Sequence, residues 1–480
     1  MAHIAVVLSG LYGRLHSGFE MMARLEDEGY RVTCLCQPYV ADTVARQGFE
    51  FIAIPEINFS YNEELDETTT LKDRVPIPVA AKGVEVGVAS PDLETTGQLG
   101  VQNTGWFAKL RKHFHSRSSR YEKGKTLLKL DEYKSIWEAL APDHALIDVE
   151  LHDLIFTAYA SGVPTTLFHT WFSDTRSLRL PPIRTAITPG VGIQGSKPGI
   201  AWAWVMNHAK IWGRYILNRL TFQEYRRSTL KRYAREVGFP VREMAISTLP
   251  PLYRFKKLPI LLLAMKELDF PHRPADNLSY VGPMVYPKRK DLEAGSVDAR
   301  NLETIFKRTQ AEGKKLVYCS VGSLAKGDVR FLKRVIEAVS REPSWELILS
   351  LGRNLTEAEF PSTPSNVHLF SWVPQLQVIE QSDCCINHAG INSINECLHF
   401  GVPMVIYSMK YTDENGNAAR MAYHGIAKVG NIDVDTADQI GSNIHEVLNV
   451  ASYRQNMATF QERYRAYRKK ELGVHLGLNT

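Results

Sequence analysis

The sequence lacks the features that mark membrane-spanning, secreted and zinc-binding proteins. It contains no uninterrupted apolar run of about 18 residues, so no membrane-spanning helix is expected. The opening MAHIAVVLSG has no basic leader and only a short apolar run, which argues against a signal peptide and favours a cytoplasmic protein. The six cysteines form neither a disulfide framework nor a C-x-x-C spacing, and we expect them to be buried core residues in a reducing compartment.

A strong excess of charge of one sign is also missing. The 57 Lys and Arg residues nearly balance the 52 Asp and Glu residues, for a net charge of +5. This balance does not call for a nucleic-acid partner; an anionic ligand or a peripheral membrane contact fits equally well. A chain of 480 residues with 44% hydrophobic residues indicates a globular protein of two or three domains, and either a monomer or a homodimer is compatible with it.

The first half opens with alternating strand and helix patterns. Short apolar runs at Ile4–Leu8, Arg31–Cys36 and Phe49–Ile54 predict strands, and the spacing of apolar residues predicts a helix near Gly18–Glu28. The loop Ser9–Ser17 would then lie at the carboxyl edge of a doubly wound sheet, where ligands bind.

The rest of the first domain, residues 1–282, is less regular. Residues 55–125 are polar and rich in turn residues, and we expect an insertion there. A helical pattern returns at Thr126–Leu140, and strand patterns follow at Ala145–Ile147 and Pro164–Phe168. Ile200–Val237 has helical composition with several tryptophans, and it is either core, an apolar acceptor wall or an interfacial surface.

A second doubly wound unit follows. Residues 283–312 are charged and contain prolines, which predicts an interdomain linker with one helix. Residues 313–451 again alternate strands with helices. Residues 452–480 form a charged helical tail that we expect to cross back to the first domain. The fold class predicted is therefore α/β, with two Rossmann-like domains facing across a cleft.

The most informative stretch lies between two predicted strands, Asp383–Ile386 and Pro403–Tyr407. The loop and helix start between these strands carry small and polar residues, namely His388, Gly390, Asn392 and Ser393. A helix start leaves backbone N–H groups without intrahelical partners, and with the helix dipole these groups form an anion site, usually for phosphate.

Three motifs occur in a fixed order around this loop. They are Trp372…Gln375, then His388-x-Gly390-x-Asn392-Ser393-x-x-Glu396, then Asp413-Glu414-x-x-Asn417. Together with Ser320-x-Gly322-Ser323, this series resembles the signature of family 1 glycosyltransferases, which have the two-domain GT-B fold and use UDP-sugars. The resemblance extends through the second half of the chain.

The resemblance implies a role for each matching residue. By position, Trp372 stacks on uracil with Val373 beside it, Gln375 and Glu396 hold the ribose, Ser323, His388, Gly390, Asn392 and Ser393 grip the diphosphate, and Asp413 and Glu414 hold the sugar. A carboxylate at Glu396 can accept from both ribose hydroxyls, which favours UDP over dTDP. The triplet Asp433-Val434-Asp435 precedes a predicted helix, where Asp is a good cap, so neither a metal nor a further cofactor is expected.

The first half resembles the same family through LYGRLHSGFEMMARLEDEGYRVT, which is most similar to carotenoid (zeaxanthin) glucosyltransferases. In the family, a His at the start of the first helix is the general base, and an Asp after the fourth strand orients it. Here Arg14 occupies the His position, and arginine stays protonated near pH 7. Either His16 serves instead, with Asp148 as its partner, or another base such as His152 is used, or the enzyme is slow or inactive.

The resulting hypothesis is an inverting glycosyltransferase. It would move a hexose, expected to be glucose, from a UDP-sugar to a hydroxyl of an apolar alcohol or phenol. A non-catalytic GT-B protein that binds a nucleotide or a partner, and an epimerase that acts on the UDP-sugar itself, remain alternatives. The acceptor is not identified by the sequence.

Overall fold

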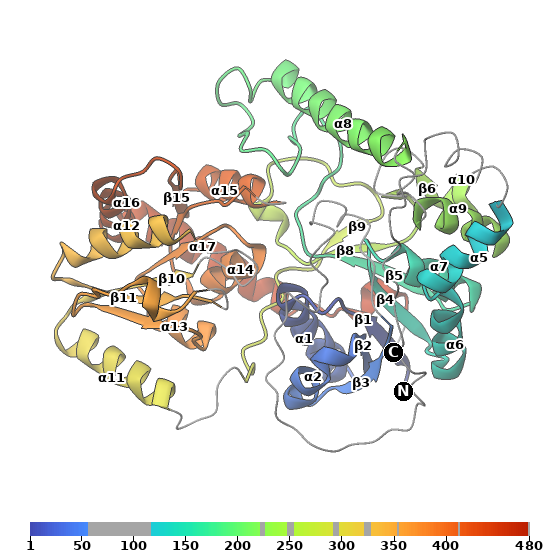
Figure 1. The fold of residues 1–480 in the computed structure, drawn as a ribbon, viewed down its shortest axis with the longest axis horizontal. Coiled ribbons are helices and arrows are strands. Elements are labelled where there is room, and N and C mark those ends of the chain that lie inside the picture. The colour runs from blue at the N-terminus through green and yellow to red at the C-terminus, as the bar shows by residue number, and fades with distance from the viewer. Residues whose placement is uncertain are drawn as a thin grey trace, which may run out of the picture.

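Two parallel sheets, each covered by helices, lie side by side in the structure (Figure 1). The computed structural model describes residues 1–55, 117–220, 226–246, 254–290, 297–320, 328–352, 355–410 and 413–478. Within these ranges the predicted pair of doubly wound α/β domains is confirmed. None of the helices described there is long and apolar enough to cross a membrane.

The first sheet has seven strands in the order β3-β2-β1-β4-β5-β8-β9, and all neighbouring strands are parallel. Its strands are β1 (His3–Val7), β2 (Arg31–Cys36), β3 (Glu50–Ala53), β4 (His144–Asp148), β5 (Thr165–His169), β8 (Ile260–Leu262) and β9 (Leu278–Tyr280). The strand order reverses between β1 and β4, and ligands of such sheets bind beyond the carboxyl ends of the strands at this point.

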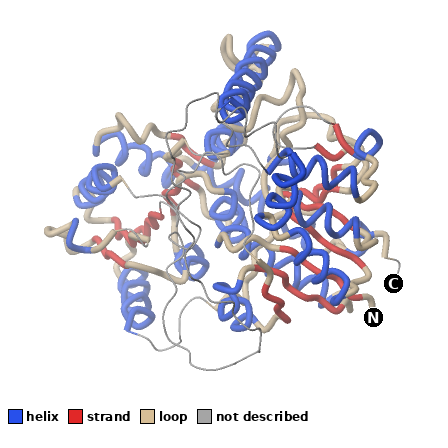
Figure 2. The backbone as a smooth tube through the Cα atoms, turned by 45° about the vertical axis from the view of Figure 1, so that its right-hand side comes forward, coloured by secondary structure: helices blue, strands red, loops and turns tan. Residues whose placement is uncertain are grey.

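Helices cover both faces of this sheet, as Figure 2 shows for the strands of the first domain between their helices. The α-helices are α1 (Tyr12–Asp27), α2 (Ala41–Gln47), α5 (Arg117–Leu127), α6 (Leu130–Leu140), α7 (His152–Ala160), α8 (Lys197–Leu220), α9 (Arg226–Glu236) and α10 (Val241–Met244). A small antiparallel pair, β6 (Ala245–Ile246) and β7 (Arg254–Phe255), and the 3-10 helices η1 (Pro38–Val40) and η3 (Lys266–Leu268) complete the domain.

Two predictions for this domain need correction. The stretch Ser9–Ser17 is not a loop throughout, because α1 begins at Tyr12. Leu15 is buried and belongs to the same apolar helix face as Phe19 and Met22, so packing against the sheet extends the helix toward its N-terminus. The continuous helix expected at Thr126–Leu140 is interrupted at Lys129, whose φ of 56° is left-handed. The predicted insertion falls mostly outside the described residues.

The second sheet has six parallel strands in the order β12-β11-β10-β13-β14-β15. Its strands are β10 (Lys315–Ser320), β11 (Trp345–Ser350), β12 (Val367–Phe370), β13 (Cys384–Asn387), β14 (Met404–Ile406) and β15 (Ala427–Val429). The helices around it are α11 (Val297–Ala311), α12 (Val329–Ser340), η4 (Glu357–Glu359), α13 (Gln375–Gln381), α14 (Ile391–Phe400), α15 (Glu414–Tyr423) and α16 (Ala437–Asn449).

The segment assigned to a linker contains a helix with a packing role. In α11, Leu302 and Ile305 are buried in one cluster with Leu316 and Ile348 of the second sheet. The chain after residue 296 therefore contributes to the second domain. All six cysteines are free and buried, as predicted.

The chain ends by returning to the first domain. Helix α17 (Ala451–Arg468) and η5 (Gly473–Leu476) follow the second sheet, and Leu472 packs in the same cluster as the first strand. The side chain of Arg24 on α1 donates to the backbone oxygen of Lys470, and Glu28 accepts from the backbone N–H of Leu472 at 2.7 Å. Both chain ends consequently lie beside the first domain in Figures 1 and 2.

Candidate nucleotide-sugar site

The two domains touch where helices α1 and α14 begin. The Asn392 side chain on α14 donates to the backbone oxygen of Gly13 and accepts from the Ser17 hydroxyl at 2.8 Å. A Cβ atom on Gly13 would lie 2.8 Å from Asn392 Nδ2, closer than real Cβ contacts. Glycine therefore allows this close approach, and predicted diphosphate contacts lie directly against the first domain.

The start of α14 has the form of an anion site. Gly390 is its N-cap, and no side chain caps the helix. The preceding Ala389 has a φ of 70°, which is a left-handed conformation. Two side chains hold it there: Asn387 accepts from the Ala389 N–H at 2.9 Å, and Asn417 donates to the Ala389 oxygen at 3.0 Å. The first backbone N–H groups of the helix, including that of Ser393, remain available to an anion.

The predicted ribose contacts form a direct pair. Gln375 at the start of α13 donates to Glu396 on α14, and the Tyr318 hydroxyl on β10 donates to Gln375 at 3.1 Å. Glu396 is only 3% exposed. Gln375, itself positioned by Tyr318, thus holds the Glu396 carboxylate at the edge of the second sheet.

Arg289 joins this carboxylate to the first domain. Its Nη1 atom lies 2.8 Å from Glu396 Oε1 and 2.9 Å from His16 Nδ1. The Arg289 and Glu396 side chains are each 4% exposed, so this is a buried ion pair across the domain boundary. The run Pro287-Lys288-Arg289-Lys290 reads from sequence as a charged linker, and no local pattern distinguishes Arg289 from its neighbours.

His16 is neutral in this arrangement. Burial, followed by the charge of Arg289, lowers its pKa well below 6.5. Since an arginine can only donate, His16 Nδ1 is the acceptor in this contact, which leaves the ring proton on Nε2. The one nitrogen that could take up a proton is the one that Arg289 occupies.

Arg14 and His16 face different partners because they are two residues apart on a helix, about 200° around its axis. Arg14 forms ion pairs with Asp148 at the end of β4 and with Glu150. Both carboxylates are nearly fully buried, and their charges raise the pKa of Arg14 despite its burial. The two predicted catalytic residues, His16 and Asp148, are each paired with a different arginine.

His152, the predicted reserve base, is part of the core. It is fully buried, and its ring stacks on Phe255 with centroids 5.5 Å apart. Its Nδ1 atom lies 3.2 Å from the backbone oxygen of Glu150. Its packing therefore accounts for its presence.

The predicted sugar contacts adjoin the diphosphate contacts. Asp413 is the N-cap of α15, and Glu414 is its first residue. Glu414 accepts from the Met409 N–H at 2.9 Å, and its other oxygen lies 4.0 Å from His388 Nε2. The pKa of His388 is lowered by burial, and the negative charge of Asp413 offsets part of this effect. His388 thus lies between the start of α14 and the two acidic residues.

The remaining predicted contacts differ in their placement. Trp372 follows β12 and is partly exposed, as a base-stacking residue must be. Val373 is 3% exposed and packs in the hydrophobic core of the second domain. Ser323 lies outside the described residues.

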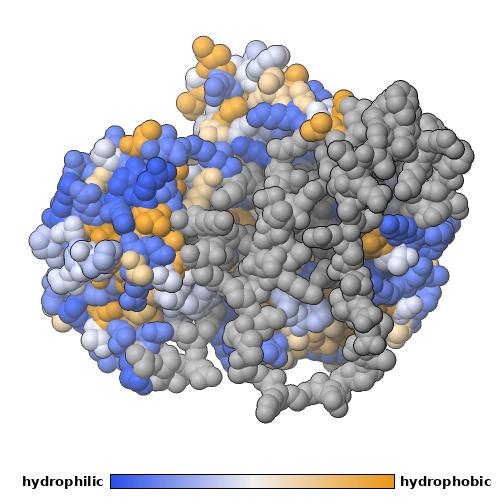
Figure 3. Space-filling view, viewed as in Figure 1, coloured by the Kyte–Doolittle hydropathy of each residue, from blue (hydrophilic) through white to orange (hydrophobic). Residues whose placement is uncertain are grey.

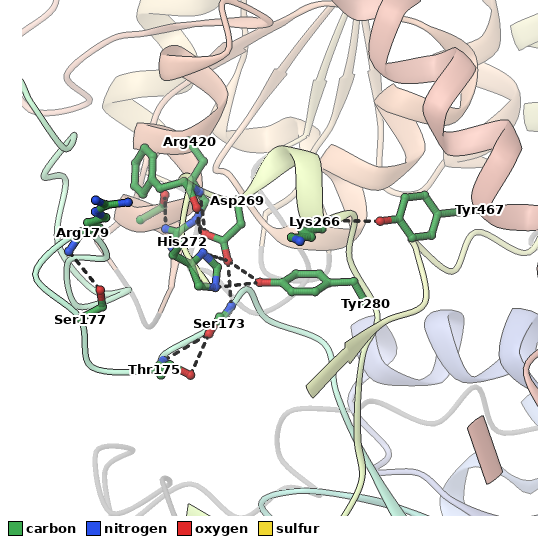
Figure 4. Close-up of polar contacts among 12 residues, drawn as sticks. Ser173, Thr175, Ser177, Arg179, Lys266, Asp269, His272, Tyr280, Arg420 and Tyr467 are labelled. Carbon is green, nitrogen blue, oxygen red and sulfur yellow. Dashed lines mark hydrogen bonds and ion pairs between the residues drawn. The ribbon is translucent and has the colours of Figure 1, made fainter. Parts of the chain in front are cut away.

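A second buried ion pair links the domains behind the sugar contacts (Figure 4). Arg420 on α15 donates to Asp269 of the first domain at 2.7 Å, and neither side chain is exposed. Tyr280 also donates to Asp269, at 2.8 Å, and the guanidinium carbon of Arg420 lies 4.6 Å from the ring centroid of Phe270. Arg420 lies seven residues after Asp413, two helical turns along the same face, and this spacing was the available sequence signal.

Two facing parallel α/β domains, with an uncapped helix start on the second domain where the two meet, define the fold as that of GT-B glycosyltransferases. Residues 222–465, just over half of the chain, match the family model described as UDP-glucoronosyl and UDP-glucosyl transferase. The chain belongs to this family.

Curated relatives match over shorter stretches. Oleandomycin glycosyltransferase of Streptomyces antibioticus is 34% identical over 27% of this chain and 30% of its own length. NDP-glycosyltransferase YjiC of Bacillus subtilis is 30% identical over 29% of this chain and 32% of its own length. Human UDP-glucuronosyltransferase 2A2 is 28% identical over 40% of this chain and 33% of its own length. The chain thus spans about a third of the length of these relatives.

Solved structures match over nearly the whole chain and support the fold. The glycotransferase of kitacinnamycin has a TM-score of 0.65 at 20% identity and covers 98% of this chain and 97% of its own. Glycosyltransferase VinC, solved in complex with dTDP, has a TM-score of 0.60 at 15% identity and covers 99% and 98%.

Proposed function

We propose that this chain transfers a hexose, expected to be glucose, from a UDP-sugar to a hydroxyl of an apolar alcohol or phenol. The observation that carries the proposal is the Gln375–Glu396 pair beside the uncapped start of α14, at the face where the domains meet. The aromatic composition of α8 suggests the apolar acceptor. The resemblance of residues 11–33 to carotenoid glucosyltransferases, which is an expectation from the sequence alone, points to the same acceptor class.

The reaction we propose is a single displacement. The acceptor oxygen attacks the anomeric carbon while the bond from that carbon to the UDP oxygen breaks, and the leaving electron pair stays on the diphosphate. The backbone N–H groups and dipole at the start of α14 would stabilise this charge. Attack from the opposite face inverts the configuration, so an α-linked donor gives a β-linked product.

We propose His16 as the base, with Arg289 as the group that controls it. Arg289 contacts both Glu396 and the Nδ1 atom of His16. Ribose hydroxyls that donate to Glu396 would compete with Arg289, and its release would free Nδ1 to take the acceptor proton. The lowered pKa keeps His16 unprotonated and ready at neutral pH.

The test measures UDP release from UDP- and dTDP-sugars with a panel of apolar alcohols and phenols. We expect the highest rate with a UDP-hexose, a β-linked product and no loss of activity with chelator. Gln375→Ala should raise the donor KM, whereas Gln381→Ala at the exposed end of the same helix should not. An α-linked product, or equal KM values in the two variants, would contradict the proposal.

The Arg14 contacts favour a second candidate, a protein that binds the nucleotide without turnover. Arg14 forms ion pairs with both Asp148 and Glu150, so an arginine stands where a histidine base would pair with Asp148. Tight UDP binding by calorimetry, with neither transfer nor hydrolysis for any acceptor, would select this candidate over the enzyme.

A further inference from the structure

Helix α8 turns an apolar face away from the protein. The helix spans 24 residues and projects from the top of the molecule in Figure 1. Six of its large apolar side chains are at least two-fifths exposed, namely Trp202, Val205, Met206, Trp212, Ile216 and Leu217. One continuous stripe along the helix is formed, because helical spacing places these side chains on the same face: Trp202, Val205, Met206, Ile216 and Leu217.

The opposite side of the helix is anchored to the first domain. Ile200 and Trp204 are buried, and the Trp204 ring N–H donates to the backbone oxygen of Leu180 at 2.8 Å. The helix is therefore apolar on both sides. A soluble surface helix normally presents polar residues outward, and an outward apolar stripe of this length indicates a contact surface.

The loop before α8 extends the same surface. Val191 is 64% exposed and Ile193 is 89% exposed. The loop packs on the first turn of the helix, since a Cβ on Gly199 would lie 2.3 Å from the Ile193 oxygen. Figure 3 shows apolar residues gathered over this part of the molecule.

The charge of this segment identifies the kind of partner. Residues 170–220 contain a single acidic residue, Asp174, which is paired with Arg254. The same residues contain seven basic ones, namely Arg176, Arg179, Arg184, Lys197, Lys210, Arg214 and Arg219. A second copy of the chain would bring like charges together, whereas an anionic surface would be attracted.

We infer that α8 and the loop 190–196 form a docking surface for an anionic phospholipid bilayer. Exposed tryptophans, aliphatic side chains and a basic surround are the composition that binds the interface between headgroups and acyl chains. The apolar stripe would enter this interface, and Lys197 and Lys210, both exposed, would contact lipid phosphates. Binding of this kind needs no spanning helix.

Bilayer docking would also supply the acceptor. Apolar alcohols and phenols partition into membranes, and α8 belongs to the domain opposite the donor site. This consequence rests on the proposed function, whereas the lipid binding itself does not.

The experiment is co-sedimentation of the full chain with vesicles, without substrates. We expect binding to phosphatidylcholine vesicles that contain roughly one third phosphatidylglycerol, and much weaker binding to phosphatidylcholine alone or at high salt. Trp202→Gln combined with Met206→Gln should lower the affinity at least about tenfold, since each side chain loses its transfer from water. The matched control, Val434→Gln with Val474→Gln, removes equally exposed apolar residues from elsewhere and should bind like wild type.

Three results would overturn the inference. They are absence of wild-type binding to anionic vesicles, equal losses in the α8 variant and the control, and a wild-type dimer that the α8 variant dissociates. The α8 variant should keep its melting temperature, which would exclude unfolding as the cause of weaker vesicle binding. If vesicle binding is found while no transfer is detected, the docking surface stands and the proposed function fails.

Discussion

The buried pair between Asp269 and Arg420 should couple the stability of the protein to the donor site. Arg420→Met keeps the length and apolar stem of the side chain but removes the charge. Asp269 would keep the hydrogen bonds from the Tyr280 hydroxyl at 2.8 Å and from the backbone N–H groups of Phe270 at 2.8 Å and Ser173 at 3.2 Å. It would lose the arginine that pairs with its charge.

The magnitude follows from the burial of the pair. Both side chains are fully inaccessible to water, so either single substitution leaves an uncompensated charge in the interior. We expect each of Arg420→Met and Asp269→Asn to lower the free energy of unfolding by about 3 to 5 kcal/mol. The double variant should lose less than the sum, because it leaves no unpaired charge, and the difference should be at least about 1 kcal/mol.

The assay is urea unfolding of the four proteins of the double-mutant cycle. Lys307→Met is the control, because it breaks the exposed Lys307–Glu303 pair on α11 and should cost less than about 1 kcal/mol. A catalytic readout accompanies it: Arg420 anchors the helix that begins with Asp413 and Glu414, so the donor KM should rise more than the acceptor KM. Additive losses in the cycle would refute the coupling, and an unchanged donor KM would refute the positioning role.

Three further predictions concern pH and close contacts. In the pH profile of kcat/KM, the loss of activity toward acid should occur below pH 6.5. Arg289→Met should move this loss to higher pH, because the arginine charge contributes to the lowered pKa of His16. A profile that does not move would exclude His16 as the base. Gly416→Ala should destabilise the protein by several kcal/mol in urea unfolding, because its Cβ would lie 1.9 Å from the Ile183 oxygen across the domain boundary. The control Gly441→Ala, whose Cβ would have its nearest neighbour at 3.9 Å, should raise stability by about 0.5 to 1 kcal/mol. Equal effects of the two substitutions would contradict the close approach at Gly416. Burial raises the pKa of Glu20 to about 7 from an ordinary 4.5, so the folded state holds this proton more tightly than the unfolded state. The free energy of unfolding of wild type should therefore fall by about 3 kcal/mol relative to that of Glu20→Gln as pH rises from 4.5 to 7. Parallel curves of stability against pH for the two proteins would show that this pKa is not raised.

Local sequence patterns suffice to predict the fold class and to propose the donor-binding residues. Apolar runs separated by helical spacing indicate parallel sheets because both faces of such strands are buried, and this local pattern survives in β1, β10 and β13. Gln375 and Glu396 were identified because the donor contacts follow one another along a short stretch of chain. Residues near in sequence at strand ends must also be near in space.

The arrangement of the first-domain residues that face the donor site depends on long-range packing, which local sequence patterns do not report. Whether Arg14 or His16 faces the cleft depends on where α1 begins, and packing of its apolar face sets that start. The Arg289 contacts with His16 and Glu396 join residues 273 and 107 positions apart, so no local pattern reports them. Burial is likewise a property of the assembled domains. It lowers the pKa of His16 and removes the Asp269–Arg420 pair from water, whereas assembly leaves an apolar face of α8 outward.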